Sequence, residues 1–207
     1  MTMTEHFNQE HFNQMVPGAE ASGTLEVHAP FDNSLIATID TGDRNVVEQA
    51  LSTAQRMFRD RDAWLPTEQR IAILERTGVI LAERRDELAL EAAREGGKPL
   101  MDSQVEVDRA IDGIRECIDG LRTQAGRGIT MGINRASLGR MAFTHHEPIG
   151  VVVAFSAFNH PVNLIVHQVG PAIAVGCPVI VKPAKATPLS CWRVVSILRE
   201  AGLPEEW

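Results

Sequence analysis

Apolar side chains recur at helical spacing through the first part of the chain. Asp43 can cap a helix, and the apolar residues between 46 and 58 then fall on one helical face. A second stripe starts near Pro66 and stops at Gly96-Gly97-Lys98-Pro99, and a third spans residues 107–121. Each stripe predicts a helix whose apolar face packs in a core, although such a face could also bind a partner.

Shorter patterns predict strands on either side of these helices. Residues 25–28 and 35–39 are apolar segments that flank a turn, and this arrangement is typical of a small hairpin. The pattern loosens after the third helix, where residues 128–146 indicate a further pair of strands that does not belong to the helical part.

The N-terminus differs from both patterns. The pentapeptide EHFNQ occurs at residues 5–9 and again at 10–14, and this polar duplication favours a flexible tail over residues 1–21. His6 and His11 could ligate a metal, but no further ligands lie nearby in the sequence. We therefore expect a solvated tail and no metal site.

The last part of the chain is almost free of charge. Only seven of the 47 charged residues lie in 148–207, and residues 148–181 contain none. Asparagine, histidine and proline residues break this run into pieces too short to span a membrane. The run instead predicts buried strands that alternate with helices, at 149–155, 162–175, 179–181 and 188–201. The predicted fold class is therefore α/β, with a helical first part followed by the start of a doubly wound parallel sheet.

Composition and charge exclude several classes of protein. The 207 residues are 44% hydrophobic and 23% charged, which indicates a globular chain rather than a disordered one. A formal net charge of −7 argues against binding to nucleic acid or to an anionic membrane. The three cysteines form no CxxC pair and the N-terminus has no secretory pattern, so we expect a cytoplasmic protein.

Two polar segments interrupt the apolar part, each after a predicted strand and before a predicted helix. They are residues 156–161 and 182–188. Ligands of parallel α/β sheets bind beyond the carboxyl ends of the strands, and the N–H groups that begin a helix favour anions. These segments are therefore the candidate site, although none of the common nucleotide-binding, hydrolase or zinc motifs is present.

Several short motifs around these segments follow one another over about 60 residues. They are EPIGVV at 147–152, FNHP at 158–161, HQVGPA at 167–172, VKPA at 181–184 and AGLP at 201–204. Their order and spacing closely resemble the aldehyde dehydrogenase superfamily. Residues 95–99, EGGKP, resemble the helix end of the same family more weakly, and the resemblance covers residue 22 to the C-terminus. It implies a Rossmann-like sheet and an NAD(P)-dependent oxidation of an aldehyde to a carboxylic acid.

The resemblance also implies roles for individual residues. The Asn159 side chain would donate a hydrogen bond to the oxyanion that forms on the substrate carbonyl, where a neutral, fixed donor is needed. Phe158 and the segment Lys182-Pro183-Ala184-Lys185 would contact NAD or NADP. Two positions depart from the family. His160 replaces a phenylalanine and could favour an anionic aldehyde, and Lys185 replaces a ribose-binding glutamate and could pair with the 2′-phosphate of NADP.

The family's mechanism also needs a cysteine nucleophile and a glutamate base. The resemblance places both beyond residue 207, and Cys117, Cys177 and Cys191 do not match the nucleophile motif. We therefore expect an N-terminal fragment that is inactive alone and belongs to a homo-oligomeric enzyme. The alternative is a truncated, non-catalytic protein that binds nucleotide weakly or associates with a subunit.

The resemblance predicts that the chain has four parts. They are a tail (1–21), the hairpin and helices of a cofactor-binding domain (22–127), a strand pair of an oligomerisation element (128–146), and the start of the parallel sheet (147–207).

Overall fold

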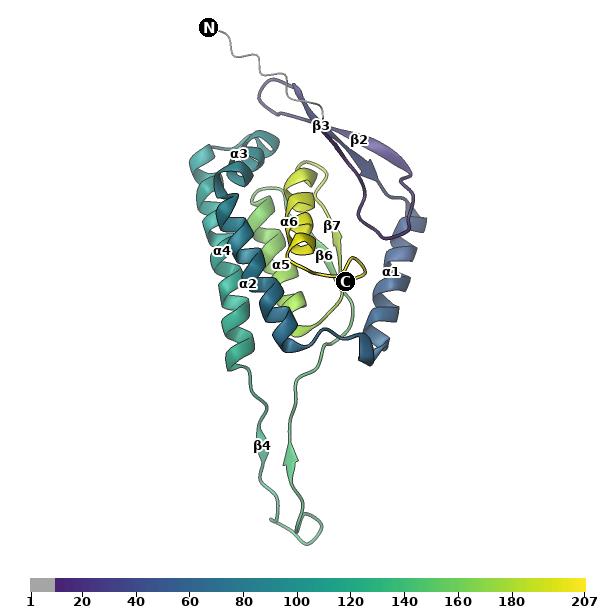
Figure 1. Cartoon of the computed structure of the whole chain (residues 1–207), viewed down its shortest axis with the longest axis vertical. Coiled ribbons are helices and arrows are strands. Elements are labelled where there is room, and N and C mark those ends of the chain that lie inside the picture. The colour runs from purple at the N-terminus through teal and green to yellow at the C-terminus, as the bar shows by residue number, and fades with distance from the viewer. Residues whose placement is uncertain (1–9) are drawn as a thin grey trace.

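The helices predicted from the apolar stripes are present. The computed structural model describes residues 10–207. Several of these helices lie together on one side of the molecule, and we call this group the helical wall. Further helices occupy the centre between the wall and the strands (Figure 1). The wall helices are α2 (Thr67–Glu83), α3 (Arg85–Gly96) and α4 (Leu100–Thr123), and the central helices are α5 (Pro161–Val175) and α6 (Pro188–Glu200).

The second apolar stripe forms two helices rather than one. The backbone turns at Arg84 (φ −101°, ψ 15°), which ends α2 and begins α3. Leu81 and Leu88 lie on either side of the turn and both are buried in the same core. The stripe is therefore continuous across the turn, which explains why spacing alone predicts a single helix. The turn lets α3 pack against α6 as well as α4.

A three-stranded sheet lies on the opposite side of the molecule from the wall. Its strands are β1 (Glu10–Phe12), β2 (Gly23–His28) and β3 (Leu35–Thr41), in the order β1-β3-β2. β2 and β3 form the predicted antiparallel hairpin. Helix α1 (Arg44–Arg59) follows, and the Asp43 side chain accepts from the first N–H groups of α1, as predicted. A short 3₁₀ turn, Arg61–Ala63, then leads into the wall.

The prediction of a flexible tail over residues 1–21 is wrong for the part that the structure describes. β1 pairs in parallel with β3, and the Phe12 side chain is only 2% exposed. Phe12 packs edge-on against Trp192 of α6 with a ring-centroid distance of 4.9 Å. The Trp192 indole donates to the carbonyl of Asn13 at 2.8 Å, and the Arg193 guanidinium pairs with Glu10 at 2.7 Å. His6 lies outside the described residues.

The parallel sheet begins with two strands, β6 (Val152–Phe155) and β7 (Val179–Lys182). They pair in parallel, as the apolar pattern predicts, and α5 connects them. The prediction that both strands are buried is wrong, because Val153 is 47% exposed, Phe155 is 67% exposed and no residue of β7 is fully buried. β6 starts three residues later than predicted because Gly150 adopts a positive φ of 151° and Ile149 is 91% exposed. The main core lies between this sheet, α5, α6 and the wall, and its largest fully buried side chains are Leu74, Leu81, Ile114, Ile165, Ile173 and Ile197.

A long arm projects from the molecule between α4 and β6 (Figure 1). Its two short antiparallel strands, β4 (Gly128–Ile129) and β5 (Ala142–Phe143), confirm the predicted strand pair. Large apolar side chains on the arm face solvent: Ile133 is 76% exposed, Met141 is 89% and Phe143 is 73%. The arm therefore has little core of its own.

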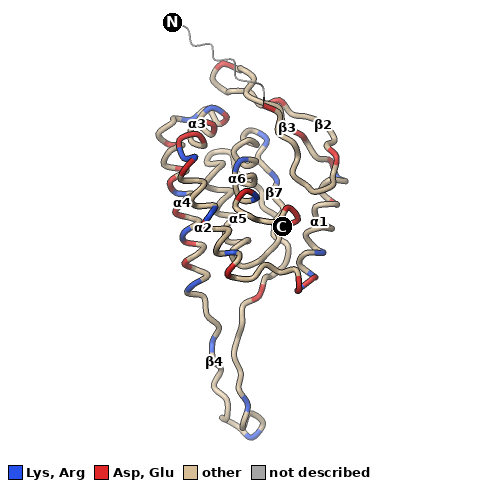
Figure 2. The backbone as a smooth tube through the Cα atoms, in the orientation of Figure 1, with Lys and Arg blue, Asp and Glu red and all other residues tan. Residues whose placement is uncertain are grey.

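Charged residues are distributed unevenly over the elements of the molecule. Charged residues are concentrated in the outer helices and loops, and α5 contains none (Figure 2). Across residues 10–207, none of the helices combines the length and the apolar character that crossing a bilayer requires. In the same residues, no three histidine, cysteine, aspartate or glutamate side chains cluster as metal ligands would.

Candidate active site

The two polar segments meet at one edge of the parallel sheet. Phe155, the last residue of β6, lies opposite Lys182, the last residue of β7. The main-chain N–H of Ser156 donates to the carbonyl of Lys182 at 3.0 Å, so the two loops leave the sheet already bonded to each other. The arrangement of a strand end followed by a loop and a helix is the one expected of a ligand site in this fold.

Asn159 lies in the first of these loops with an exposed side chain. Its side-chain amide forms no hydrogen bond within residues 10–207, but its main-chain carbonyl accepts from the Lys98 ammonium at 3.3 Å. Lys98 belongs to the turn between α3 and α4. The backbone of the exposed Asn159 is thus bonded to the turn that joins two helices of the wall.

The predicted anion sites at the helix N-termini are not open to a ligand. The main-chain N–H groups of Val162 and Asn163 in α5 donate to the buried Glu106 carboxylate at 2.6 and 3.0 Å. In α6, the N–H groups of Leu189 and Ser190 donate to the buried Glu95 carboxylate. The helix ends do attract anions, but those anions are side chains of the wall. Sequence reasoning missed both glutamates.

Glu95 has an unusual ionisation. Its side chain, which also accepts from the Ser190 hydroxyl at 2.7 Å, is almost fully buried. Burial raises the pKa of Glu95 to about 7, against the opposing effect of the three hydrogen bonds from Ser190 and Leu189. No cation pairs with this carboxylate among residues 10–207. Near neutral pH the Glu95 carboxyl therefore exists in both protonation states.

His160 ends the first loop and caps α5 without a side-chain bond to it. The Nδ1 atom of His160 lies 3.7 Å from the Glu106 carboxylate, and the side chain is 39% exposed. One part of the ring thus faces the buried glutamate and the rest faces solvent beside Asn159. Whether it contacts a substrate stays a prediction.

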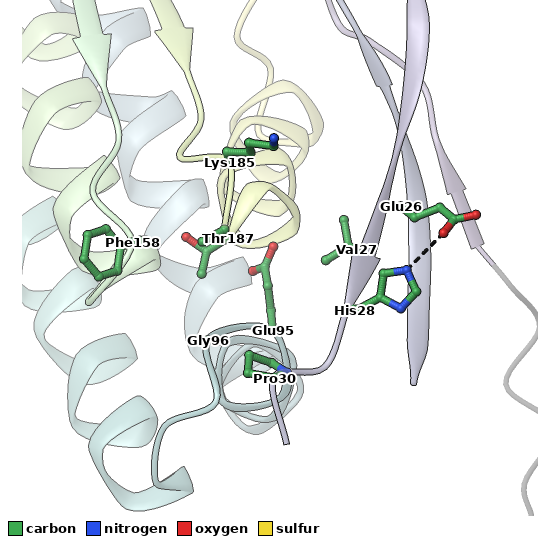
Figure 3. Close-up of a pocket in the computed structure, with 10 residues that line it drawn as sticks. Glu26, Val27, His28, Pro30, Glu95, Gly96, Phe158, Lys185 and Thr187 are labelled. Atoms are coloured by element: carbon green, nitrogen blue, oxygen red, sulfur yellow. Dashed lines mark hydrogen bonds and ion pairs between the residues drawn. The ribbon is translucent and has the colours of Figure 1, made fainter. Parts of the chain in front are cut away.

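A cavity of about 280 Å³ opens beside the second loop (Figure 3). Phe158, Lys185 and Thr187 line it from the two loops, and Glu95 and Gly96 line it from the end of α3. The other side of the cavity is lined by Glu26, Val27, His28 and Pro30 of the hairpin. The cavity therefore brings together two of the predicted cofactor residues, Phe158 and Lys185. Lys182, Pro183 and Ala184 do not line it.

The charges around this cavity suit a phosphorylated ligand. The Lys185 ammonium is exposed and forms no ion pair within the described part of the chain. The Thr187 hydroxyl is buried there and has no hydrogen-bond partner among residues 10–207. The nearby carboxylates are already engaged, because Glu26 binds His28 at 3.0 Å and Glu95 caps α6. A hydrogen bond from His28 to the Asn33 carbonyl, followed by the contact with Glu26, raises the pKa of His28 and favours its cationic form. The unpaired ammonium and hydroxyl are donors of the kind that a phosphate group accepts.

None of the three cysteines is placed as a nucleophile. Cys177 and Cys191 are buried, and burial raises the pKa of the Cys191 thiol to about 12. Cys117 is half-buried beside a cavity of about 540 Å³ between α4 and α5, and burial raises the pKa of its thiol as well. A nucleophilic cysteine needs the opposite shift, because only the thiolate reacts.

Comparison with known proteins defines the class. The sequence pattern of the aldehyde dehydrogenase family matches residues 17–207, and the chain belongs to this family. It is 33% identical over 181 residues to the 3-sulfolactaldehyde dehydrogenase of Priestia aryabhattai, covering 87% of this chain and 37% of that protein.

Solved structures of the family share the fold. Aldehyde dehydrogenase 21 from Physcomitrella patens, solved with the reaction product succinate, is 30% identical with a TM-score of 0.86 over 96% of this chain and 42% of its own. The glyceraldehyde-3-phosphate dehydrogenase GapN of Methanocaldococcus jannaschii, complexed with NADP, is 29% identical with a TM-score of 0.80 over 88% and 39%. The chain thus spans about two fifths of the length of these relatives.

Proposed function

We propose that this chain supplies the cofactor contacts and the oxyanion donor of an NAD(P)-dependent aldehyde dehydrogenase. The observation that carries the proposal is the meeting of the Asn159 and Lys182–Lys185 loops at one sheet edge, in a chain that belongs to this family. Both loops are exposed at their tips and tethered at their bases, as a binding site requires.

Asn159 carries the catalytic part of the proposal. When a nucleophile adds to the aldehyde carbonyl, negative charge develops on the oxygen, and a preorganised neutral donor stabilises that charge without needing to reorient. The exposed Asn159 amide is such a donor, and the bond from Lys98 limits the movement of its backbone. Removal of one such donor costs roughly a hundredfold or more in turnover.

The lysines of the second loop carry the cofactor part. The bound nicotinamide cofactor would accept a hydride from the substrate. Lys182 would contact its adenosine ribose, Lys185 would bind its 2′-phosphate, and the unpaired Thr187 hydroxyl could add a hydrogen bond. Because Lys185 has no acceptor for a ribose hydroxyl, we propose a preference for NADP. The presence of NADP in the similar GapN structure supports this choice.

The proposed substrate is an aldehyde that carries a negative charge. His160 lies beside Asn159 and leaves part of its ring exposed. The relatives point the same way, since one is a 3-sulfolactaldehyde dehydrogenase, one was solved with the product succinate and one is a glyceraldehyde-3-phosphate dehydrogenase. Each of these molecules carries an anionic group that a protonated imidazole could bind.

A second candidate function is a non-catalytic protein that associates with a complementary subunit. The raised thiol pKa values of Cys117 and Cys191 favour it, because they leave no activated nucleophile among the cysteines. The exposed apolar side chains of the arm suit an interface in a cytoplasmic homo-oligomer. We therefore expect the 207-residue chain alone to show no aldehyde oxidation, and sedimentation of the purified chain should reveal association.

The test of the proposed function is nucleotide binding by the purified chain. We expect calorimetric titration to show tighter binding of NADP than of NAD. The Lys185→Glu variant should lose about tenfold in NADP affinity, the equivalent of one charge-assisted hydrogen bond, and gain affinity for NAD. Arg44→Glu, which reverses an exposed charge on α1, is the matched control and should change neither affinity.

Two results would contradict this proposal. Equal loss of NADP affinity in both charge-reversal variants would assign the effect to net charge rather than to Lys185. Tighter binding of NAD than of NADP by the wild-type chain would overturn the proposed preference. Oxidation of an aldehyde by the purified chain alone would separately refute its inactivity.

A further inference from the structure

The loop that carries Asn159 is fixed from a distant part of the sequence. Helix α5 has no side-chain cap of its own, because His160 makes no capping bond and Pro161 has no N–H to give. Glu106 of α4 takes that place and accepts from two N–H groups of α5. The helix that follows Asn159 is thus held at its first turn by the wall.

Lys98 extends this connection to Asn159 itself. Its ammonium pairs with the Glu106 carboxylate and also donates to the Asn159 carbonyl at 3.3 Å. The Glu106 side chain is fully buried and the Lys98 side chain is 15% exposed, so both charges are largely removed from solvent. Such a pair is held firmly in one geometry, because either charge alone would be costly at this depth.

The turn that carries Lys98 is itself constrained. Gly97 ends α3 with a φ of +63°, a left-handed conformation that glycine adopts without strain. A Cβ atom at this position would lie 3.0 Å from the Cβ of Pro30 in the hairpin loop. The constrained turn therefore ends α3 and also brings the Lys98 side chain to the loop after β6.

The second loop shows how a buried glutamate caps a helix without a lysine partner. Glu95 caps α6 just as Glu106 caps α5, but a serine hydroxyl completes its bonds and no cation joins it in residues 10–207. A buried glutamate is therefore sufficient to cap either helix. The lysine is an addition confined to the loop that holds Asn159.

We propose that Lys98 and Glu106 are positioning residues that fix the backbone of Asn159, so that its side-chain amide is preorganised toward the substrate carbonyl. This inference rests on the proposed function for the role of Asn159. The positioning can nevertheless be measured without turnover or bound nucleotide, so failure of nucleotide binding and failure of positioning are separate results.

The first experiment compares backbone order in the ¹⁵N-labelled 207-residue chain. In the wild type we expect an NMR order parameter near 0.85 for Asn159, the value of rigid backbone, and in Lys98→Met a fall to below about 0.6. The methionine keeps the aliphatic stem and removes the cation. Lys98→Arg keeps a cation and should restore much of the order at Asn159.

The matched control is Glu95→Gln, which alters the cap of the other helix. It should leave the order parameter of Asn159 unchanged. An unchanged Asn159 in Lys98→Met would overturn the proposal. So would an equal loss of order across residues 156–187, because that result would describe a general structural role.

A second measurement needs no variant and remains decisive if Lys98→Met does not fold. The chain has three lysines, Lys98, Lys182 and Lys185, so their ammonium signals can be told apart. We expect the Lys98 ammonium protons to exchange with water at least about tenfold more slowly than those of the two exposed lysines, because they are hydrogen-bonded and shielded. Equal exchange at all three lysines would overturn the proposal.

Discussion

The two loops at the sheet edge have the same plan but differ in how their anchoring charge is compensated. Each follows a parallel strand and precedes a helix that starts with proline, and a glutamate from the wall caps each helix. Glu106 has Lys98 as a partner, whereas Glu95 relies on the Ser190 hydroxyl. A buried carboxylate can thus be stabilised by a cation, as at Glu106, or by hydrogen bonds and partial protonation, as at Glu95. The two arrangements should respond differently to mutation and to pH.

Removal of the charge at Glu106 should have the largest effect. Glu106→Gln keeps an oxygen for the α5 amides but leaves the Lys98 ammonium without its buried partner. We expect the free energy of unfolding to fall by about 3 kcal/mol, the lower end of the range for a broken buried pair, because Lys98 retains some solvent contact. Urea denaturation of the chain measures this change.

The double variant Lys98→Met/Glu106→Gln sharpens the result. It removes the unpaired cation, so it should be more stable than Glu106→Gln alone. A double variant that loses the sum of the two single effects would show that the residues do not interact.

The pH dependence of Glu95 should have the next largest effect. Its pKa is raised to about 7 from the ordinary 4.5, so the folded chain binds this proton more tightly than the unfolded chain does. The resulting stabilisation is fully present below the ordinary pKa and disappears as the pH rises through 7. We expect the free energy of unfolding to fall by up to about 3 kcal/mol between pH 4.5 and pH 8.

Two variants assign this pH dependence to its source. Glu95→Gln should flatten the decline, since the amide does not titrate. Glu87→Gln, an exposed position on the same helix, should leave the decline as it is. Burial also raises the pKa of Glu91 against the attraction of Arg193, so part of the slope should persist in Glu95→Gln. A slope in Glu95→Gln equal to that of the wild type would refute the assignment.

The smallest effect on stability should come from His160, whose side chain is 39% exposed and whose Nδ1 atom lies 3.7 Å from the Glu106 carboxylate. His160→Phe should change the free energy of unfolding by less than about 1 kcal/mol, as for other partly exposed contacts of this kind. It should still weaken binding of succinate by about fivefold, since an anion-binding imidazole is lost. Calorimetric titration with succinate and with its uncharged diamide separates the two effects, and equal weakening of both ligands would argue against an anion contact.

Much of the fold follows from local pattern, for reasons that particular residues make clear. The apolar stripes of α1 and α4 fix their buried faces, and Asp43 marks the start of α1. The uncharged run predicts β6, α5 and β7 because continuous apolar strands alternating with helices are typical of a parallel sheet, although Val153 and Phe155 of β6 are exposed here. Asn159 and Lys182 could be singled out because Asn159 follows β6 and Lys182 ends β7.

The anchoring glutamates could not be found in the same way. Glu95 and Glu106 belong to helices rich in charge, where a glutamate ordinarily faces solvent. A signal does exist, because Glu95 follows Leu88 and Ala92 on the buried stripe and Glu106 precedes Ala110 on another. Its meaning depends on which helix N-termini lie opposite, and that is a property of the tertiary fold. β1 was missed for the same reason, since Phe12 is buried in a cluster that the hairpin and α6 form together.

The docking of β1 also bears on the order in which the molecule folds. Residues 10–15 bind residues 192–199, so this contact closes a loop that includes nearly the whole chain. Loops of that length form late, since the closure entropy must be offset by structure that already exists. The ribosome makes this strand before α6, so the binding surface of the strand on α6 does not exist until residue 199 has been added. A protease that cleaves near residue 15 should therefore report the completion of folding rather than its beginning.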